Sequence, residues 1–574
     1  MFPPATLPSV LDASLIRPFF RPNAAFDKIY RFANEALSYM MDIQFLPETN
    51  DSIMRRFTRA LAPILSCILI QTQAFAQRGA DWMTAGSDAQ RSNWQRTDGK
   101  ISVASMSKPG FEVVWKLKPK NQARNLNNLQ APSLLEFIIG HKGFRSLGFF
   151  GASGDKVVGV DIDLGTVEWE KTFATDAAPA TAECPGGLTA AVTRPTVTAY
   201  AANFGGGRGR SGPPKGAVGE PHEGAVTLKK APTPRPPQPP KPAAAKPGAV
   251  TDSPFAPRVQ YAVALAGDGA LHSMWVLTGH ESNTPIPFVP AGANAVGLIS
   301  YGGDTYVSTL AGCPNIDSGV WAVDMSTKVV KKWKAPDSGV VGTVGQAAGA
   351  DGTIYVSAGN GELHALAAKT LEPLRNFKTG GVELSSSPVL FEHKGKDMIA
   401  VSTVDGKVHV IDAASMSAAA SSDAVLGAGY AVGALTSWQD SGGVRWIVAP
   451  GASAVTAFKV VDKDRGVAIE KGWTSRELVS PIAPVAVNGV LFALSTGESR
   501  TTGESRKGSV PERIRTSKPA VLYALDGTNG KELWNSGSAI TSFVHSGMMS
   551  VGGSRVFLST YEGTQYVFSF PMEH

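Results

Sequence analysis

From about residue 80 onward, short apolar runs recur along the chain and tight-turn signals separate them. Asp268-Gly269, Asn360-Gly361 and Asp405-Gly406 are turns of this kind, each placed between two runs rich in strand-forming residues. The pattern predicts antiparallel β-hairpins. The composition, with 61 Gly and 39 Pro in 574 residues, agrees with a turn-rich and mostly β protein.

One hairpin is repeated. Its clearest copy runs from Ala524 to Trp534 and includes Asp526 and Gly530, and a second copy runs from Gly159 to Trp169 around Asp161. Looser copies begin at Ala322, with Asp324 and Trp333, and at Ala365. In this unit an apolar strand ends at the Asp, whose carboxylate accepts backbone N–H groups in the turn. The following strand carries a Trp that is large enough to fill the gap to a neighbouring unit.

The position three residues before the Asp gives the number of repeats. It is occupied in turn by Val158, His272, Trp321, His364, His409, Thr456, Tyr523 and Tyr566. Five of the seven steps between these residues are 43–49 residues long, which is the period of a propeller blade. The two longer steps each contain a low-complexity insertion. Eight positions predict eight blades.

The ends of the chain predict how the ring closes. The last repeat ends with Gln565–Phe570 and lacks its Trp-bearing outer strand, whereas Phe111–Lys116 precedes the first repeat and has the character of that strand. Borrowing it would remove the open edges of the ring. The predicted fold is therefore an all-β, eight-bladed β-propeller closed by an N-terminal strand, with disordered insertions.

The repeat resembles the tryptophan-containing unit of pyrroloquinoline-quinone (PQQ)-type propellers, Ala-x-Asp-x-x-Thr-Gly-Lys-x-x-Trp. Asp81-Trp82-Met83-Thr84-Ala85-Gly86 is similar to the Asp-Trp-x-x-x-Gly segment that precedes the first blade in quinoproteins. The resemblance covers roughly residues 80–570 and is specific for fold. It implies one of two functions. Quinoprotein dehydrogenases bind PQQ and Ca²⁺ over the central channel and oxidise alcohols or sugars, whereas the outer-membrane assembly scaffold lipoprotein uses the same repeats to hold protein partners.

A secretory leader is predicted inside the chain, at residues 54–76. Arg55, Arg56 and Arg59 form its basic part, Leu61–Ile70 its apolar part, and Ala74-Phe75-Ala76 its cleavage site after Ala76. Residues 1–53 are then a non-native or disordered extension, and residues 77–574 are the propeller. The predicted location is periplasmic or secreted, and no transmembrane segment is expected after leader removal.

Two insertions interrupt the blades. Residues 203–257 are rich in Gly and Pro and carry eight basic and three acidic residues, which predicts a disordered loop inside blade 2. Residues 498–518 are a shorter basic loop inside blade 7. Because the excess positive charge lies in the leader and the first of these loops, the folded part is close to neutral, which argues against a nucleic-acid-binding face.

Cys184 and Cys313 remain after leader removal. The repeat places them in loops on the same face of neighbouring blades, so in an oxidising compartment they form either a disulfide or two free thiols.

No catalytic or cofactor-binding residue is predicted. His272, His364 and His409 share one repeat position, but other blades place Trp or Tyr there, so a packed ring is favoured over a metal site. Trp275, which replaces the motif Asp in blade 2, is interpreted as packing and not as a platform for a quinone. The chain has no adjacent cysteines and no Cys-x-x-Cys-His haem motif, and it shows no Gly-x-Ser-x-Gly elbow.

The favoured function is therefore a monomeric, non-catalytic scaffold that binds a protein partner in the bacterial cell envelope. A dehydrogenase that depends on PQQ and Ca²⁺ is the alternative, and no cofactor is assigned.

Overall fold

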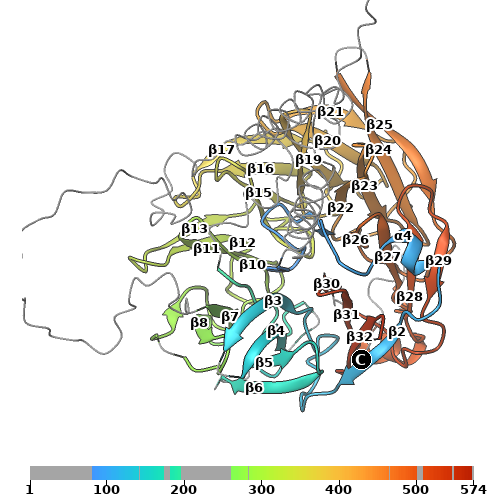
Figure 1. Cartoon of the computed structure of the whole chain (residues 1–574). Coiled ribbons are helices and arrows are strands. Elements are labelled where there is room, and N and C mark those ends of the chain that lie inside the picture. Colours follow the sequence, from blue (N-terminus) through green and yellow to red (C-terminus); the bar gives the residue numbers. More distant parts are fainter. Residues whose placement is uncertain are drawn as a thin grey trace, which may run out of the picture. The chain divides into compact units, whose positions relative to one another are not determined.

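A computed structural model describes residues 81–571, apart from residues 141, 174–180, 182, 196–259, 282, 464–465, 501–508 and 546–547. The predicted extension at 1–53, the leader at 54–76 and the loop at 203–257 all lie outside these residues. The described strands form eight sheets arranged as the blades of a propeller, which confirms the predicted fold (Figure 1).

The first four blades follow the chain from the inside of the ring outward. Their strands are β3 (Ser133–Gly140), β4 (Gly143–Ala152), β5 (Lys156–Asp161) and β6 (Thr166–Thr172) in blade 1; β7 (Tyr261–Leu265), β8 (Ala270–Trp275) and β9 (Ile286–Pro287) in blade 2; β10 (Ala295–Tyr301), β11 (Asp304–Thr309), β12 (Gly319–Asp324) and β13 (Val330–Lys334) in blade 3; and β14 (Ala347–Ala348), β15 (Ile354–Ser357), β16 (Glu362–Leu366) and β17 (Pro373–Lys378) in blade 4. The inner strand of blade 2 is reduced, within the described residues, to one bridge between Thr193 and Val263.

The remaining blades have the same order. Their strands are β18 (Val389–His393), β19 (Lys396–Ser402), β20 (Val408–Asp412) and β21 (Ser417–Ser421) in blade 5; β22 (Thr436–Gln439), β23 (Arg445–Pro450), β24 (Val455–Lys463) and β25 (Gly466–Thr474) in blade 6; β26 (Val485–Val487), β27 (Val490–Ser495), β28 (Val521–Asp526) and β29 (Glu532–Asn535), joined by β1 (Trp94–Gln95), in blade 7; and β30 (Ser550–Gly552), β31 (Arg555–Ser559), β32 (Gln565–Ser569) and β2 (Glu112–Leu117) in blade 8.

The ring closes through β2, as predicted. This N-terminal strand pairs antiparallel with β32, with Val113 opposite Phe568 and Trp115 opposite Val567. The eight residues of the predicted repeat column fall on the third strand of eight different blades. The repeat period read from the sequence is therefore the period of the blades.

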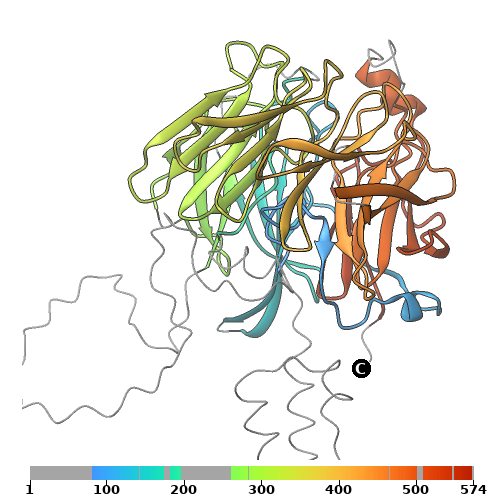
Figure 2. The ribbon, with the colours of Figure 1, turned by 90° about the horizontal axis from the view of Figure 1, so that it is seen from above.

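Antiparallel strands give the propeller two different faces. The links between blades and the loops between second and third strands lie on one face, here called the loop face; the other connections lie on the opposite, turn face. Helix α6 (Val510–Thr516) lies in a second-to-third-strand loop, and helix α4 (Val103–Met106) lies beside blade 7. Figure 2 shows α6 and the β3–β4 turn at opposite ends of the blades.

The repeat motif explains how neighbouring blades adhere. Asp161, Asp324 and Asp526 each accept backbone N–H groups of the following turn, at 2.8–3.0 Å. Three indoles donate Nε1–H to the carbonyl of the residue after the Asp position in the next blade: Trp115 to Ile162 at 3.1 Å, Trp169 to Val276 at 2.9 Å, and Trp473 to Gly527 at 3.0 Å. Trp534 instead packs edge-on against Phe111 and Phe568 of the closing blade.

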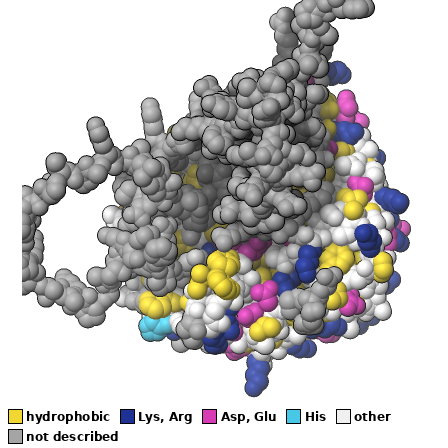
Figure 3. Space-filling model, viewed as in Figure 1, with side chains coloured by type: hydrophobic (Ala, Val, Ile, Leu, Met, Phe, Trp, Pro, Cys, Tyr) yellow, Lys and Arg dark blue, Asp and Glu magenta, His cyan; other side chains and the backbone are white. Residues whose placement is uncertain are grey.

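No helix in the described ranges is long and apolar enough to cross a membrane. Basic and acidic side chains are interspersed over the visible described part of the surface in Figure 3.

Candidate functional site

The centre of the ring is occupied by the chain's own N-terminal segment, residues 82–98, which Figure 1 shows in blue. It contacts the blades in sequence order. Backbone or side-chain hydrogen bonds join Trp82 to Leu134, Met83 to Arg194, Thr84 to Leu298, Ala89 to Ala348, Gln90 to Leu390, Ser92 to Ser437, Asn93 to Ala486, and Asp98 to Ser554. One segment thus touches all eight blades and fixes their inner strands.

Arg91 is the cation at the middle of this segment. Its side chain is buried and donates to three carbonyl oxygens: Gln346 at 2.8 Å, Ala85 at 2.8 Å and Gly297 at 2.7 Å. Burial lowers its pKa to about 10, against the charge of Asp88, which favours the protonated form. The interior of the ring is therefore stabilised by a guanidinium whose donors are satisfied by two blade carbonyls and one carbonyl of the central segment.

Small apolar side chains close the channel toward the loop face. Each of six blade links contributes one residue, two or three positions before the first strand, and these residues pack with Ala85 of the central segment: Ala131, Ala191, Val344, Ala434, Ala483 and Met548. Their side chains are all at most 8% exposed. The wall of this mouth is therefore apolar at the axis.

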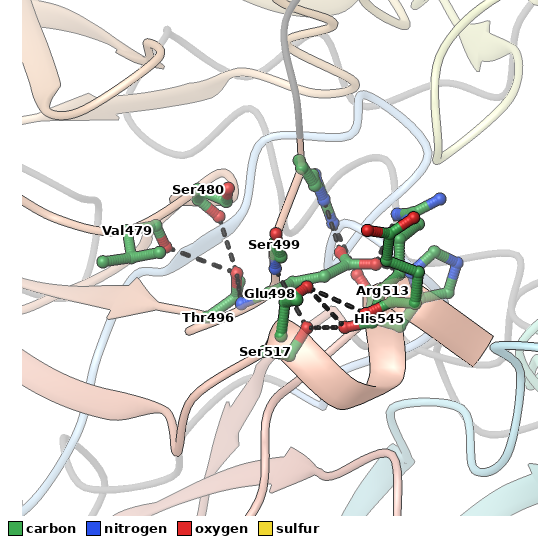
Figure 4. A network of polar contacts seen from close by, with 11 residues as sticks. Val479, Ser480, Thr496, Glu498, Ser499, Arg513, Ser517 and His545 are labelled. Atoms are coloured by element: carbon green, nitrogen blue, oxygen red, sulfur yellow. Dashed lines mark hydrogen bonds and ion pairs between the residues drawn. The ribbon is translucent and has the colours of Figure 1, made fainter. Parts of the chain in front are cut away.

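A buried carboxylate lies on the same face, in the loop between the second and third strands of blade 7. Glu498, just after β27, has a fully buried side chain and accepts from Arg500 Nε and His545 Nδ1 at 2.5 Å each and from Arg513 of α6 (Figure 4). Arg500 also donates to the carbonyl of His545 at 2.6 Å. Two further bonds hold the segment: Thr496 donates to the Ser480 carbonyl at 2.8 Å, and Ser517 accepts from the Ser499 N–H at 2.9 Å.

The charges of this network decide what it can bind. Burial alone would raise the pKa of Glu498, but the charge of Arg500, together with His545 and Arg513, holds it well below its usual range. Burial lowers the pKa of His545, against the carboxylate, which favours its protonated form. Two guanidinium groups around one carboxylate leave a positive excess. A Ca²⁺ ion needs several free oxygen ligands, and here both carboxylate oxygens are occupied by cations, so Glu498 does not fit a calcium site.

The disulfide lies on the loop face as well. Cys184, in the link before blade 2, is paired with Cys313 of blade 3, with their Cα atoms 4.9 Å apart. The bond spans blade 2, whose inner strand is the shortest in the described ring. It therefore ties blade 3 to the link before blade 2, across the blade that carries the large insertion.

The three histidines of the repeat column lie in separate blades with separate partners. His272 contacts Glu281 at 2.6 Å and Asp268 at 3.1 Å, His364 packs on Trp333 with ring centroids 4.9 Å apart, and His409 contacts Ser421 at 2.8 Å. Within the described residues no group of three His, Cys, Asp or Glu side chains is placed to hold a metal ion.

Trp275 is 37% exposed and lies beside His280, with ring centroids 6.2 Å apart, on the turn face and away from the channel mouth. It is therefore not positioned as a platform for a planar ligand over the channel.

Sequence reasoning missed the Glu498 network. The interval 498–518 reads as a basic loop, whereas in the structure it begins with a buried acid and contains α6, which has Pro511 in its first turn. The available signal was an acid two positions before Arg500, but Glu504 and Arg506 repeat that pattern, and the partner His545 is 47 positions away and is brought close only by the ring. Arg91 gave no signal, because nothing in the local sequence indicates burial.

Neither a protein-family model nor a curated protein sequence matches the chain. Solved structures do match. The quinohemoprotein alcohol dehydrogenase from Comamonas testosteroni aligns with a TM-score of 0.53 at 12% identity, covering 88% of this chain and 82% of the other. A quinohemoprotein alcohol dehydrogenase from Pseudomonas putida HK5 (ADHIIG) aligns with 0.50 at 10% identity, covering 86% and 82%. A europium-containing methanol dehydrogenase aligns with 0.50 at 10% identity, covering 85% and 98%. At these identities the likeness is one of fold: the chain has the propeller fold of PQQ-type quinoproteins.

Proposed function

We propose that this chain is an exported, non-catalytic PQQ-like propeller that acts as an interaction scaffold in the bacterial cell envelope. The observation that carries the proposal is Glu498. A carboxylate at the loop-face mouth would be the natural ligand for Ca²⁺ in a dehydrogenase, but here it is ion-paired with Arg500 and Arg513. Its role is to fix the loops to one another.

Loops that are fixed to one another suit partner binding, because such loops lose little entropy on association. Two apolar side chains stand out from this face: Val479, whose carbonyl accepts from Thr496 beside the network, is 46% exposed, and Val425 is 38% exposed. They lie on consecutive blade links. We infer that this region contacts the partner.

Export is supported by the predicted leader and by the Cys184–Cys313 bond, since disulfides persist in oxidising compartments. The PQQ- and Ca²⁺-dependent dehydrogenase is the alternative, and none of the described residues around Glu498 favours it.

The partner surface is tested by site-specific photo-crosslinking in a bacterium that expresses the full chain with its leader. A crosslinking residue at Val479 or Val425 should capture one and the same envelope protein. Val329 is the matched control, because it is also a valine, is 50% exposed and lies on the turn face. Equal capture at Val329 and Val479, or a cytoplasmic location of the chain, would contradict the proposal.

A further inference from the structure

Two arginines meet around one indole on the turn face, between blades 5, 6 and 7. Trp94 belongs to β1, which pairs with β26 of blade 7, and Arg445 begins β23 of blade 6. The guanidinium carbon of Arg96 lies 4.1 Å from the centre of the Trp94 ring, and that of Arg445 lies 5.5 Å from it. Arg445 also lies 5.9 Å from the ring of Phe391 in blade 5.

Among the described residues, neither guanidinium group has a hydrogen-bonded carboxylate, and the Nε atom of each is buried without a partner. Arg445 is only 9% exposed, and its Nε atom, like that of Arg96, has no hydrogen-bond partner. Among the described residues no carboxylate lies within ion-pairing distance of either group. This contrasts with Arg91 and Arg500, whose donors reach oxygen atoms. A buried cation without an acceptor is costly, so such a pair is expected to be completed by a ligand.

The surrounding charges define the ligand. Glu392 is the acid whose charge acts on Arg445, and Asp88 is the acid whose charge acts on Arg96 and on Arg91. Three arginines face two carboxylates, which leaves one positive charge in excess. Burial lowers the pKa of Arg445 to about 10, and the positive charge of Arg96 adds to this lowering. The two guanidinium groups therefore repel each other in the absence of an anion.

We propose that Arg96 and Arg445 form a binding site for a single carboxylate group at the turn-face mouth of the channel. Guanidinium groups bind carboxylates through paired N–H donors, and one carboxylate balances the excess charge. The carboxylate belongs either to a small organic acid or to the C-terminus of a peptide. This inference does not rest on the scaffold function, because it concerns the opposite face of the propeller.

The test measures the melting temperature of the purified full chain at constant ionic strength while sodium acetate replaces sodium chloride. Wild-type protein should gain about 1–3 °C at saturating acetate, because a ligand that binds only the folded state stabilises it. Arg445→Gln and Arg96→Gln should abolish the gain. Arg445→Gln should keep or raise the melting temperature without acetate, since it removes an unpaired buried cation. Arg96, which is less buried, tests the same site if Arg445→Gln does not fold.

Arg476→Gln is the matched control. Arg476 also lies over an aromatic ring, 5.1 Å from Tyr523, but it is paired with Glu532 at 2.8 Å. This variant should retain the full acetate response. If acetate raises the melting temperature of Arg445→Gln and Arg96→Gln as much as that of the wild type, the proposed carboxylate site is wrong.

Further probes separate the two sources and test the ligand class. Acetylglycylglycine with a free C-terminus should stabilise the protein, whereas its C-terminal amide should not. If acetylglycylglycine raises the melting temperature at a lower concentration than acetate does, the ligand is assigned as a peptide C-terminus. If only acetate raises the melting temperature, the ligand is assigned as a small organic acid. Stabilisation by inorganic phosphate but by neither carboxylate would overturn the assignment to a carboxylate. Arg445→Gln should leave crosslinking at Val479 unchanged. The carboxylate site can therefore be disproved without disproving the scaffold function, and the reverse also holds.

Discussion

Each end of the channel has its own glutamate, and the two lie in surroundings of opposite charge. On the loop face, Glu498 is enclosed by cations and its pKa is held below the usual range. Toward the turn face, Glu136 accepts from the Gly553 N–H at 2.9 Å and from Gln95 at 3.2 Å. Burial, together with the charges of Asp81 and Asp98, raises its pKa to about 7. On the loop face the buried carboxylate is paired with cations, whereas toward the turn face Glu136 is not ion-paired among the described residues.

This difference separates the two ends by role. The loop-face mouth combines the Glu498 network, an apolar axis and a disulfide, which tie its described loops to one another. The turn-face mouth retains charged groups with incomplete partners, namely Glu136 and the pair Arg96 and Arg445. We therefore expect the loop face to present a preformed surface and the turn face to respond to pH and to small ions.

The largest expected effect is that of Glu498→Gln. Removing one partner of a buried ion pair leaves the others uncompensated and costs about 3–5 kcal/mol of the free energy of unfolding. Urea unfolding at pH 7 measures this loss. Glu512→Gln is the control, since Glu512 lies in α6 of the same interval but is exposed and contacts Arg515 only at 3.9 Å. Equal stability of the two variants would show that the network does not organise the loop face.

The network also predicts acid sensitivity of the wild type. Because the folded pKa of Glu498 is depressed, its contribution is present above the unfolded value of about 4.3 and is lost as the pH falls below it. Glu498→Gln should lack this acid loss.

The disulfide should have the next largest effect. Its two cysteines are 129 residues apart, and a native bond that closes a loop of this length is worth about 2–5 kcal/mol. The double variant Cys184→Ser, Cys313→Ser should lose this amount in urea unfolding. Peptide mapping without reductant should join the two cysteine peptides. Recovery of both peptides as free thiols from the exported protein would contradict the pairing.

Glu136→Gln should have a smaller effect of opposite sign. Since the folded pKa of Glu136 is raised, its contribution is complete below the unfolded value of about 4.3 and is lost as the pH rises through about 7. The variant should be more stable than the wild type by about 1–2 kcal/mol at pH 8 and equal to it near pH 4. Unfolding at the two pH values checks this. Destabilisation at pH 8 would show that the carboxylate has a cationic partner.

The blade pattern was predictable because the Asp, the turn and the Trp of each repeat lie close together in the sequence and act within one hairpin. The fifth residue of the motif turn, counted from the Asp position, has a positive φ in six blades. Three of these residues are glycine, namely Gly165, Gly279 and Gly530, and the other three are Lys328, Leu371 and Met416. The glycines occur where an indole of the preceding blade covers the turn. A Cβ at Gly530 would lie 2.5 Å from the Trp473 ring. The glycine is therefore required by the close approach of Trp473, and not only by the reversal of the chain.

In blade 4 this glycine is missing, and the joint with blade 3 differs from the others. Leu371 takes this position in blade 4, and Trp333 of blade 3 then packs on His364 instead. An open pocket of about 560 Å³, lined in part by these two rings, lies at that joint. The sequence identified Trp333 as a repeat residue but did not indicate this contact.

The two mouths were not predictable, because they are assembled from distant links. Glu498 meets His545, and Glu136 meets Gly553, only after the ring has closed. Burial raises the pKa of Glu136, whereas the cations around Glu498 lower its pKa despite burial, and both sets of neighbours are brought together by the folded ring. Charge counted along the chain could not separate Glu498 from an exposed acid in a basic loop.

The most direct test of the central claim is to offer the cofactors. The purified protein is equilibrated with PQQ and excess Ca²⁺ and desalted, after which bound quinone is read from its absorbance and turnover from dye-linked oxidation of alcohols and sugars. A non-catalytic scaffold predicts neither retained quinone nor turnover. Stoichiometric quinone with Ca²⁺-dependent dye reduction would contradict the account.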